Sequence, residues 1–186
     1  MSKRDAAVIG AGPAGLAAAA MLRRRGVDVV VIDRAEAVGS SWRGHYDRLH
    51  LHTVRWLSDL PGLRMPRSYG RWVHRDGVIE YLERYAAHHQ LDLMLDTDVR
   101  QLSRDGGGWV LDTSRGEIVA GSVVVATGYN HTPFMPEYPG RDEFTGSLTH
   151  ASTYRNAEPY RDRDVLVVGS GNTGAEIAVD LSLIHI

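Results

Sequence analysis

Two glycine-rich loops constrain the fold of this chain more than any other feature. The first is Gly10-Ala11-Gly12-Pro13-Ala14-Gly15, and the second is Gly169-Ser170-Gly171-Asn172-Thr173-Gly174. In this spacing the first glycine permits a tight turn, the second lets a pyrophosphate approach the backbone, and the third lets a helix pack closely on a strand. The phosphates then lie at the positive end of the following helix. Two such loops, each after an apolar strand, predict two nucleotide sites, one for a flavin and one for a nicotinamide.

The residues around the first loop predict a βαβ unit. A short strand over residues 6–10 leads into a helix that runs from Pro13 to about Arg25, and Gly26 ends it. Residues 29–32 are a β-branched run typical of a parallel strand covered on both faces. Asp33 then stands roughly twenty residues beyond the loop, where an acid hydrogen-bonds a ribose hydroxyl. A generic aspartate at a strand end is the alternative interpretation.

The remaining pattern predicts an α/β protein. We expect a Rossmann-like FAD-binding domain, a parallel sheet with an antiparallel β-meander, followed by the start of a second, truncated Rossmann NAD(P)-binding domain. Residues 38–56 are irregular and typical of a ligand-lining segment. The expected elements are a helix over 77–89 with Asp76 as its N-cap, strands over 91–95 and 122–127, a meander of 99–102, 109–113 and 117–119, an extended proline-marked crossing at 133–139, and a strand over 165–168. The predicted domains are 1–160, which includes the interdomain linker, and 161–180.

Charge and composition argue against several classes of protein. The formal net charge of −2 leaves no basic footprint for nucleic acid. The longest apolar run, residues 14–22, is too short to cross a bilayer and is explained by the first helix, so no membrane association is expected. No signal peptide is recognised, and the absence of cysteine fits a cytoplasmic location. The nine histidines are scattered, and no metal site is predicted.

The last six residues, 181–186, form a separate case. Leu181-Ser182-Leu183-Ile184-His185-Ile186 reads like the translation of a sequencing-library adapter. We therefore expect a scar at this position and leave it out of the functional argument. The alternative is an ordinary amphipathic helix end.

Several segments together resemble a known family. The first loop, the segment 39–42 and Val125-Ala126-Thr127-Gly128-Tyr129 resemble flavin-dependent monooxygenases that use FAD and NADPH. A sharper match is the segment 144–155, which fits that family's fingerprint of Phe, Gly, His and then an aromatic residue followed by a basic one. Baeyer–Villiger enzymes end a similar pattern with Trp and Pro or Asp, so Tyr154-Arg155 resembles the flavin-containing monooxygenase branch. The segment 46–52 further resembles the plant auxin-forming (YUCCA-type) members.

The sequence also departs from this family. Ser40 stands where the family usually has a second glycine, and Asp33 stands where FAD enzymes more often carry Glu. His52 aligns with an Asn that contacts flavin and nicotinamide in animal members, and it resembles the YUCCA-type variant.

The resemblance implies a reaction and a set of residues. NADPH would reduce FAD, and a flavin C4a-hydroperoxide formed with O2 would pass one oxygen to a small nitrogen, sulfur or keto-acid substrate. His52 is the catalytic candidate beside the isoalloxazine, with Thr53 next to it. His150 would organise the interdomain link, and Arg155 would reach the NADP phosphate or lie in solvent. The expected cofactor-binding residues are Gly10, Gly12, Pro13, Ala14, Gly15, Asp33, Arg34, Ser41, Trp42, His52, Thr53, Val99, Thr127, Gly128, Gly169, Ser170, Gly171, Asn172, Thr173 and Gly174.

Three other functions share features of this sequence pattern. A pyridine nucleotide–disulfide reductase also carries two such loops, but it passes electrons through a cysteine pair, and this chain has none. A Baeyer–Villiger-type monooxygenase and a non-catalytic FAD-binding redox module remain alternatives. The 186-residue chain by itself is expected to be poorly soluble and inactive. The substrate, the oligomeric state and the choice of NADPH over NADH are not predicted by the sequence.

Overall fold

The protein is described by a computed structural model covering residues 2–128 and 132–184. Tyr129, which belongs to the segment that resembles the monooxygenases, and residues 185 and 186 lie outside the described residues. One six-stranded sheet forms the centre of the molecule, in the order β3-β2-β1-β6-β5-β4. Its strands are β1 (Ser2–Ile9), β2 (Val29–Ile32), β3 (Asp92–Met94), β4 (Val99–Asp105), β5 (Gly108–Thr113) and β6 (Gly116–Val125).

The sheet joins a parallel half to an antiparallel half through one strand. β1 pairs in parallel with β2 and with β6, and β2 pairs in parallel with β3. β5 pairs antiparallel with both β6 and β4. β6 therefore belongs to both halves, and the predicted α/β fold with a parallel sheet and an antiparallel meander is confirmed.

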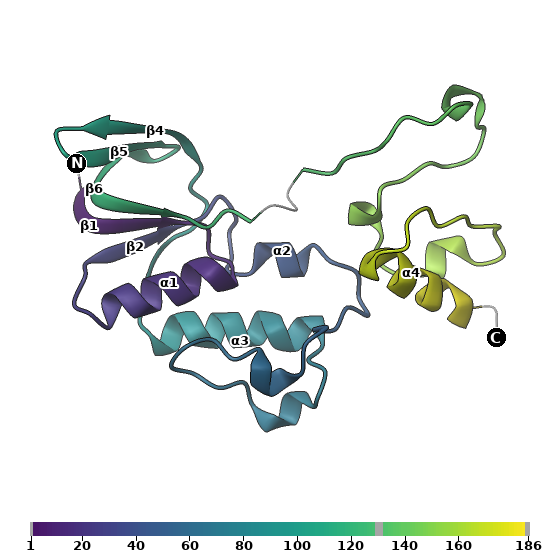
Figure 1. Cartoon of the computed structure of the whole chain (residues 1–186), viewed down its shortest axis with the longest axis horizontal. Coiled ribbons are helices and arrows are strands. Elements are labelled where there is room, and N and C mark those ends of the chain that lie inside the picture. Colours follow the sequence, from purple (N-terminus) through teal and green to yellow (C-terminus); the bar gives the residue numbers. More distant parts are fainter. Residues whose placement is uncertain (1, 129–131, 185–186) are drawn as a thin grey trace.

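Helices cover one face of this sheet. The helices are α1 (Pro13–Arg23), α2 (Ser40–Arg43), α3 (Arg75–His88) and α4 (Asn172–Leu183), and short 3₁₀ turns occupy Arg55–Leu57, Arg67–Tyr69, Arg141–Glu143, Ala151–Thr153 and Glu158–Tyr160. α1 and α3 lie against the sheet, whereas α4 lies beyond α2 at the end of the long segment that leaves β6 (Figure 1).

The strands alternate between two apolar clusters, as a sheet with both faces covered requires. Ala6, Val8 and Val31 pack with α1 and α3 on the helical face. On the other face, Ala7 and Ile32 pack with residues of β5 and β6. A third cluster, which we call the α4 interface, joins α4 to the segments around Tyr46 and Tyr154. Its buried members are Tyr46, Leu49, Tyr154, Ala157, Ile177 and Leu181.

Some predicted boundaries were wrong. β1 begins at Ser2 rather than at residue 6, because β6 is long enough to pair Ser2 with Ile118. The predicted strands 117–119 and 122–127 are one continuous strand, β6. α1 ends at Arg23, two residues earlier than predicted, and Gly26 follows in the left-handed region.

The predicted N-cap of α3 was also wrong. His74, not Asp76, is the N-cap, and its Nδ1 accepts the Asp76 N–H at 3.2 Å. A histidine nitrogen with a lone pair thus replaces the expected carboxylate. The helix begins at Arg75, two residues earlier than expected.

The strand predicted over residues 165–168 is absent from the described structure. These residues have no assigned secondary structure, and Leu166 is 86% exposed. A strand exists only where a neighbour supplies ladder hydrogen bonds, and none of the six described strands lies beside this segment. The glycine loop and helix that follow it form nonetheless.

Candidate dinucleotide-binding site

The first glycine loop forms the turn that its spacing predicts. Gly10 has a φ of +112°, and a Cβ there would lie 2.3 Å from the Ala126 carbonyl oxygen of the segment that follows β6. A Cβ on Gly15 would lie 1.9 Å from the Gly10 carbonyl oxygen. Both positions therefore exclude a side chain, because real Cβ atoms do not approach so closely.

Gly12 differs from its two neighbours in having open space around it. A Cβ built there would meet no described atom within 4 Å. Gly12 is the N-cap of α1, and no side chain of the described residues accepts from the first turn of this helix, which contains Pro13 and Ala14. Exposed first-turn N–H groups and the helix dipole form a site for an anionic group. The loop therefore fits the pyrophosphate of a dinucleotide.

The carboxylate of Asp33 holds the backbone of this loop through hydrogen bonds. One oxygen accepts the Ala11 N–H at 2.6 Å, and the other accepts the Ala35 N–H at 2.9 Å. The Gly10 N–H donates to the Ile32 carbonyl oxygen at 2.7 Å. The acid predicted to meet a ribose thus also holds the backbone of the turn, and its ribose contact stays a prediction.

Other predicted cofactor residues surround the loop. The Gly39 N–H donates to the Ala11 carbonyl oxygen at 3.0 Å, which places Ser41 and Trp42 of α2 next to the loop. Trp42 is half-buried against both the helical face and the α4 interface. Thr127 and Gly128 follow Ala126, whose carbonyl oxygen lies beside Gly10. Arg34 is exposed, and Val99 lies at the start of β4, close to Asp33 because the Thr97 N–H donates to the Asp33 carbonyl oxygen at 2.9 Å.

The second glycine loop repeats the geometry of the first. Gly169 has a φ of +124°, and a Cβ on Gly174 would lie 2.2 Å from the Gly169 carbonyl oxygen. Gly171 is the N-cap of α4 and has the same open space as Gly12, judged on the described atoms. Ser170 and Thr173 lie in the same turn. The two loops therefore share the tight first turn, the open second glycine and the close contact at the third glycine.

α4 binds the rest of the molecule through two acids one helical turn apart. Glu176 contacts Nε2 of His52 and accepts the Tyr46 hydroxyl at 2.7 Å. Asp180 is buried and accepts the Tyr154 hydroxyl at 2.6 Å. Burial, followed by the neighbouring carboxylate, raises the pKa of Tyr46 and that of Tyr154 above the ordinary tyrosine value.

His52 lies between the two halves of the site. Besides Glu176, it contacts Asn172 of the second loop, with 2.9 Å between the histidine Nδ1 and the amide nitrogen. Thr53 bonds to Ser58, with 2.6 Å between the hydroxyl oxygens. The structure thus brings His52 and Asn172 together, although 120 residues separate them in the sequence.

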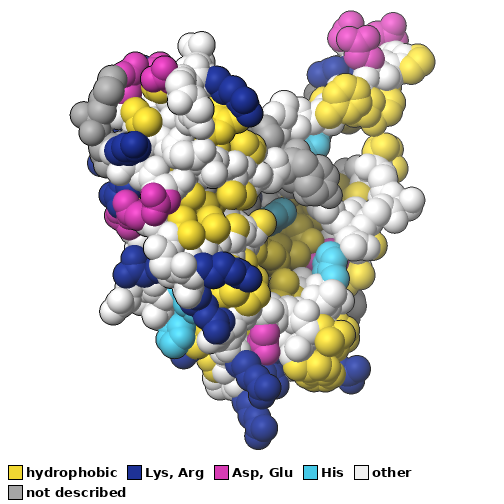
Figure 2. Space-filling view, turned by 60° about the vertical axis from the view of Figure 1, so that its left-hand side comes forward, with side chains coloured by type: hydrophobic (Ala, Val, Ile, Leu, Met, Phe, Trp, Pro, Cys, Tyr) yellow, Lys and Arg dark blue, Asp and Glu magenta, His cyan; other side chains and the backbone are white. Residues whose placement is uncertain are grey.

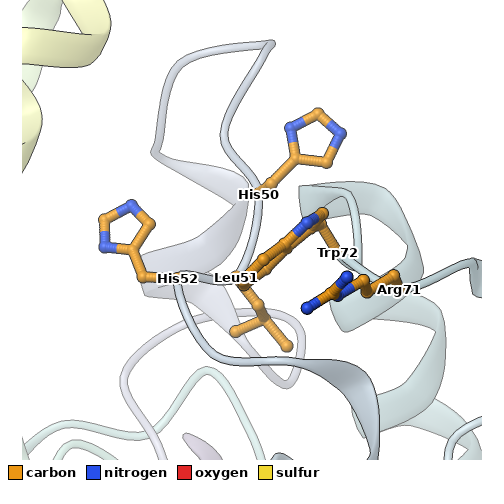
Figure 3. Close-up of a pocket in the computed structure, with 5 residues that line it drawn as sticks. All are labelled: His50, Leu51, His52, Arg71 and Trp72. Atoms are coloured by element: carbon orange, nitrogen blue, oxygen red, sulfur yellow. The ribbon is translucent and has the colours of Figure 1, made fainter.

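An open hollow lies beside His52. It is lined by His50, Leu51, His52, Arg71 and Trp72 (Figure 3). The Arg71 guanidinium lies 5.4 Å from the Trp72 ring centroid, within the range of a cation–π contact. Hydrophobic side chains gather in a hollow of the surface that histidine side chains flank (Figure 2).

The fingerprint segment is held against the first unit at its C-terminal end. Asp47 accepts hydrogen bonds from Arg75 at 2.9 Å and from Asn156 at 2.8 Å, and its N–H donates to the Arg155 carbonyl oxygen. The bond from Asn156 and then the Arg75 charge hold the pKa of Asp47 below its usual value. Arg155 is exposed, and its guanidinium donates to the Gly44 carbonyl oxygen.

His150 contributes to the same segment. Its Nδ1 accepts the Ser152 N–H at 3.1 Å and caps a 3₁₀ turn. Its role in organising the link between the two units stays a prediction.

Sequence reasoning missed four residues of this site: Tyr46, Tyr154, Glu176 and Asp180. Tyr46 and Tyr154 both stand in segments that carry the family resemblance, but neither was given a role. The available signal was the spacing of Glu176 and Asp180, which places two acids on one face of an apolar helix. Their partners lie far away in the sequence, so the signal did not say what they bind.

The described residues contain neither a metal-binding cluster nor a membrane-spanning helix. Within 2–128 and 132–184, no group of three or more His, Cys, Asp or Glu side chains is arranged to hold a metal ion. The helices described in this range are all too short or too polar to cross a membrane.

Comparison with known proteins now identifies the family. Two phosphate-binding glycine loops on an α/β scaffold define the class of flavoprotein oxidoreductases with two dinucleotide sites. Residues 7–183 match the family described as pyridine nucleotide-disulphide oxidoreductase, and the chain belongs to that family. It is 39% identical over 180 residues to the indole-3-pyruvate monooxygenase YUCCA1 of Oryza sativa, covering 95% of this chain and 44% of the relative.

Solved structures agree with this assignment. The flavin-containing monooxygenase of Stenotrophomonas maltophilia superposes with a TM-score of 0.93 at 32% identity, over 99% of this chain and 56% of that one. The S-allyl-L-cysteine S-oxygenase of Allium sativum gives a TM-score of 0.88 at 25% identity, over 97% of this chain and 49% of that one. The predicted resemblance to flavin monooxygenases, including YUCCA-type members, is confirmed. The chain spans about half the length of the relatives that it matches.

The family description includes disulfide reductases. Disulfide reduction through a cysteine pair requires two thiols, and the 186 residues contain no cysteine. The named relatives above are monooxygenases or oxygenases. The chain is thus similar to the oxygenating members.

Proposed function

We propose that this chain is the FAD-binding part of an FAD- and NADPH-dependent monooxygenase that places one oxygen atom from O2 on a small substrate. The observation that carries the proposal is the pair of matching glycine loops with open space at Gly12 and Gly171. FAD would bind at the first loop and the nicotinamide dinucleotide at the second. When bound, the flavin supplies the redox chemistry with O2, and the protein supplies binding, orientation and a dry site.

Named residues have distinct tasks in this proposal. The first-turn amides of α1 bind the pyrophosphate, and Asp33 holds the loop in shape while its carboxylate meets the ribose. Val99 offers its backbone to the adenine. His52 lies where the two units meet, and it is the catalytic candidate beside the flavin. Trp42 and Trp72 supply apolar surface that excludes water.

The substrate class follows from the relatives. The printed names include an enzyme for indole-3-pyruvate, a keto acid, and an S-oxygenase for S-allyl-L-cysteine, a thioether. We propose a nitrogen, sulfur or keto-acid substrate, with a keto acid as the first to be tried because the YUCCA-type relative is 39% identical. The cytoplasmic location and the domain boundary near residue 160 stay predictions.

The test uses a full-length protein that contains this chain. Purified protein should carry FAD, and it should consume O2 in an NADPH-dependent manner that indole-3-pyruvate accelerates. Trimethylamine and a simple thioether are run in parallel, because a preference for either redirects the substrate assignment. A protein that folds but binds no FAD contradicts the proposal. FAD binding without NADPH oxidation would favour the non-catalytic redox module instead.

A further inference from the structure

His52 is held by two residues of the second glycine-loop unit. Its Nδ1 lies 2.9 Å from the side-chain nitrogen of Asn172, and its Nε2 contacts a carboxylate oxygen of Glu176. Asn172 is the first residue of α4, and Glu176 lies one turn further along the same helix. The imidazole ring therefore spans one helical turn, with one nitrogen on each partner.

The chemistry of these partners defines the tautomer of His52. An amide nitrogen can only donate, so Nδ1 must accept the bond from Asn172. The ring proton then lies on Nε2, which donates to the Glu176 carboxylate. With this arrangement both ring nitrogens have a suitable partner.

The carboxylate of Glu176 is itself held in place by a further hydrogen bond. Its second carboxylate oxygen accepts the Tyr46 hydroxyl at 2.7 Å, and Tyr46 is only 4% exposed within the α4 interface. A rigid, buried tyrosine thus orients the carboxylate that orients the histidine. Such a chain of hydrogen bonds restricts each member more than a single contact does.

We infer that Glu176 and Asn172 are positioning residues that fix the tautomer and the ring orientation of His52. The consequence rests on the proposed function: the histidine expected beside the flavin is set by the loop expected to bind the nicotinamide dinucleotide. Docking of the second loop and presentation of His52 to the flavin are then one event. A histidine held only by its own unit would lack this dependence.

α4 contains a matched control for Glu176. Asp180 lies one turn further along, accepts the Tyr154 hydroxyl at 2.6 Å and pairs with Arg48 at 3.5 Å, and it does not contact His52. Glu176→Gln and Asp180→Asn each remove one charge from the same helix and keep the side-chain shape. A merely structural role in docking α4 predicts that the two variants behave alike.

The experiment records the ring-nitrogen signals of histidine in a ¹⁵N-labelled full-length protein that contains this chain, without added flavin, and His52→Gln assigns the His52 signals. In the unaltered chain we expect the Nε2–H tautomer. The glutamine amide of Glu176→Gln cannot accept from Tyr46 and His52 as the carboxylate does, so the Nδ1–H tautomer should rise by about threefold to tenfold, the ratio equivalent to one lost hydrogen bond. Asp180→Asn should leave the His52 signals unchanged.

Two results would overturn this inference. One is an unaltered chain in which His52 is mainly the Nδ1–H tautomer, and the other is a Glu176→Gln variant whose His52 signals match those of Asp180→Asn. The amide signals of α4 are recorded in both variants, so a variant that fails to fold is recognised, and Tyr46→Phe then provides a second way to loosen Glu176. Added FAD should further shift the His52 signals. A chain that binds no FAD contradicts the proposed function and leaves the tautomer result readable.

Discussion

At the scale of single residues, the glycines of the first loop fall into two kinds, those with no room for a side chain and one with open space. At Gly15 a Cβ would lie 1.9 Å from the Gly10 carbonyl oxygen, so the protein itself occupies the space. At Gly12 the space is open among the described atoms, and only a ligand would be displaced. The two positions therefore separate folding from binding.

Alanine substitution at these two positions should give opposite results. Gly15→Ala overpacks the turn and should lower the free energy of unfolding by about 1–3 kcal/mol. Gly12→Ala should leave the unfolding free energy nearly unchanged but weaken FAD binding by about tenfold or more, which is ~1.4 kcal/mol. Denaturant unfolding and FAD titration by fluorescence measure the two effects. Equal losses of stability in both variants would contradict this distinction.

Some residues of the site could be predicted from the sequence, and others could not. Gly10, Gly12 and Gly15 were predictable because their constraint is local and is written in their spacing. The contact of His52 with Glu176 was not predictable, because 124 residues separate the partners. The N-cap at His74 was missed because an imidazole nitrogen performed the task usually done by an acid.

At the scale of elements, α3 holds the irregular segment in front of it through two tyrosines. The Tyr81 hydroxyl accepts the Leu60 N–H at 2.7 Å and donates to the Leu63 carbonyl oxygen at 2.7 Å. The Tyr85 hydroxyl donates to the Pro61 carbonyl oxygen at 2.7 Å. Helical spacing places both rings on one face, so a helix of ordinary amphipathic pattern also fixes a loop. The sequence predicted the helix, but the bonds from its tyrosines to the loop needed the structure.

This arrangement predicts a loss of stability at alkaline pH. Burial raises the pKa of Tyr81 to about 12, above the value of about 10 for an unfolded chain. The phenol therefore ionises first in the unfolded state, so its contribution is complete below pH ~10 and is lost as the pH rises toward 12. Urea unfolding between pH 8 and about pH 11 should show a falling free energy of unfolding.

Tyr81→Phe should make that decline shallower without removing it, because Tyr46 and Tyr154 also have raised pKa values and titrate in the same direction. The same variant should cost about 1–2 kcal/mol at neutral pH, because the loop loses both hydrogen bonds. Tyr138→Phe, at a 41% exposed residue of the extended segment, is the matched control and should keep the original decline. Identical pH profiles for the two variants would show that Tyr81 is not responsible.

At the scale of the whole molecule, the second unit is docked but its strand is missing. α4 is held through Glu176 and Asp180, whereas residues 165–168 pair with none of the described strands. The sequence pattern of this segment is that of a strand, but a strand also needs neighbours. Val165, Leu166 and Val168 are exposed instead.

Exposed apolar side chains with unpaired backbone favour self-association. We expect the 186-residue chain to associate in a concentration-dependent manner. Leu166→Lys, at the most exposed of these positions, should increase the monomer fraction measured by sedimentation velocity. It should leave the melting temperature within about 2 °C, since a fully exposed side chain contributes little to stability.

The control for this prediction is Leu57→Lys, a change at a 76% exposed leucine elsewhere on the surface. It adds the same charge without altering residues 165–168. If both variants increase the monomer fraction equally, general charge repulsion and not this segment governs association.

Because both halves of the sheet share β6, a change in the length of this strand disturbs both halves. β6 pairs Ile118 with Leu111 on one side and with Ser2 on the other, and its end brings Ala126 to Gly10. One inserted codon within it would exchange inward and outward side chains downstream and move the turn partner of the first loop out of place. Tags and reporter peptides are therefore best inserted in the hairpin turns at 106–107 or 114–115. An insertion there leaves the register of the strands on either side unchanged.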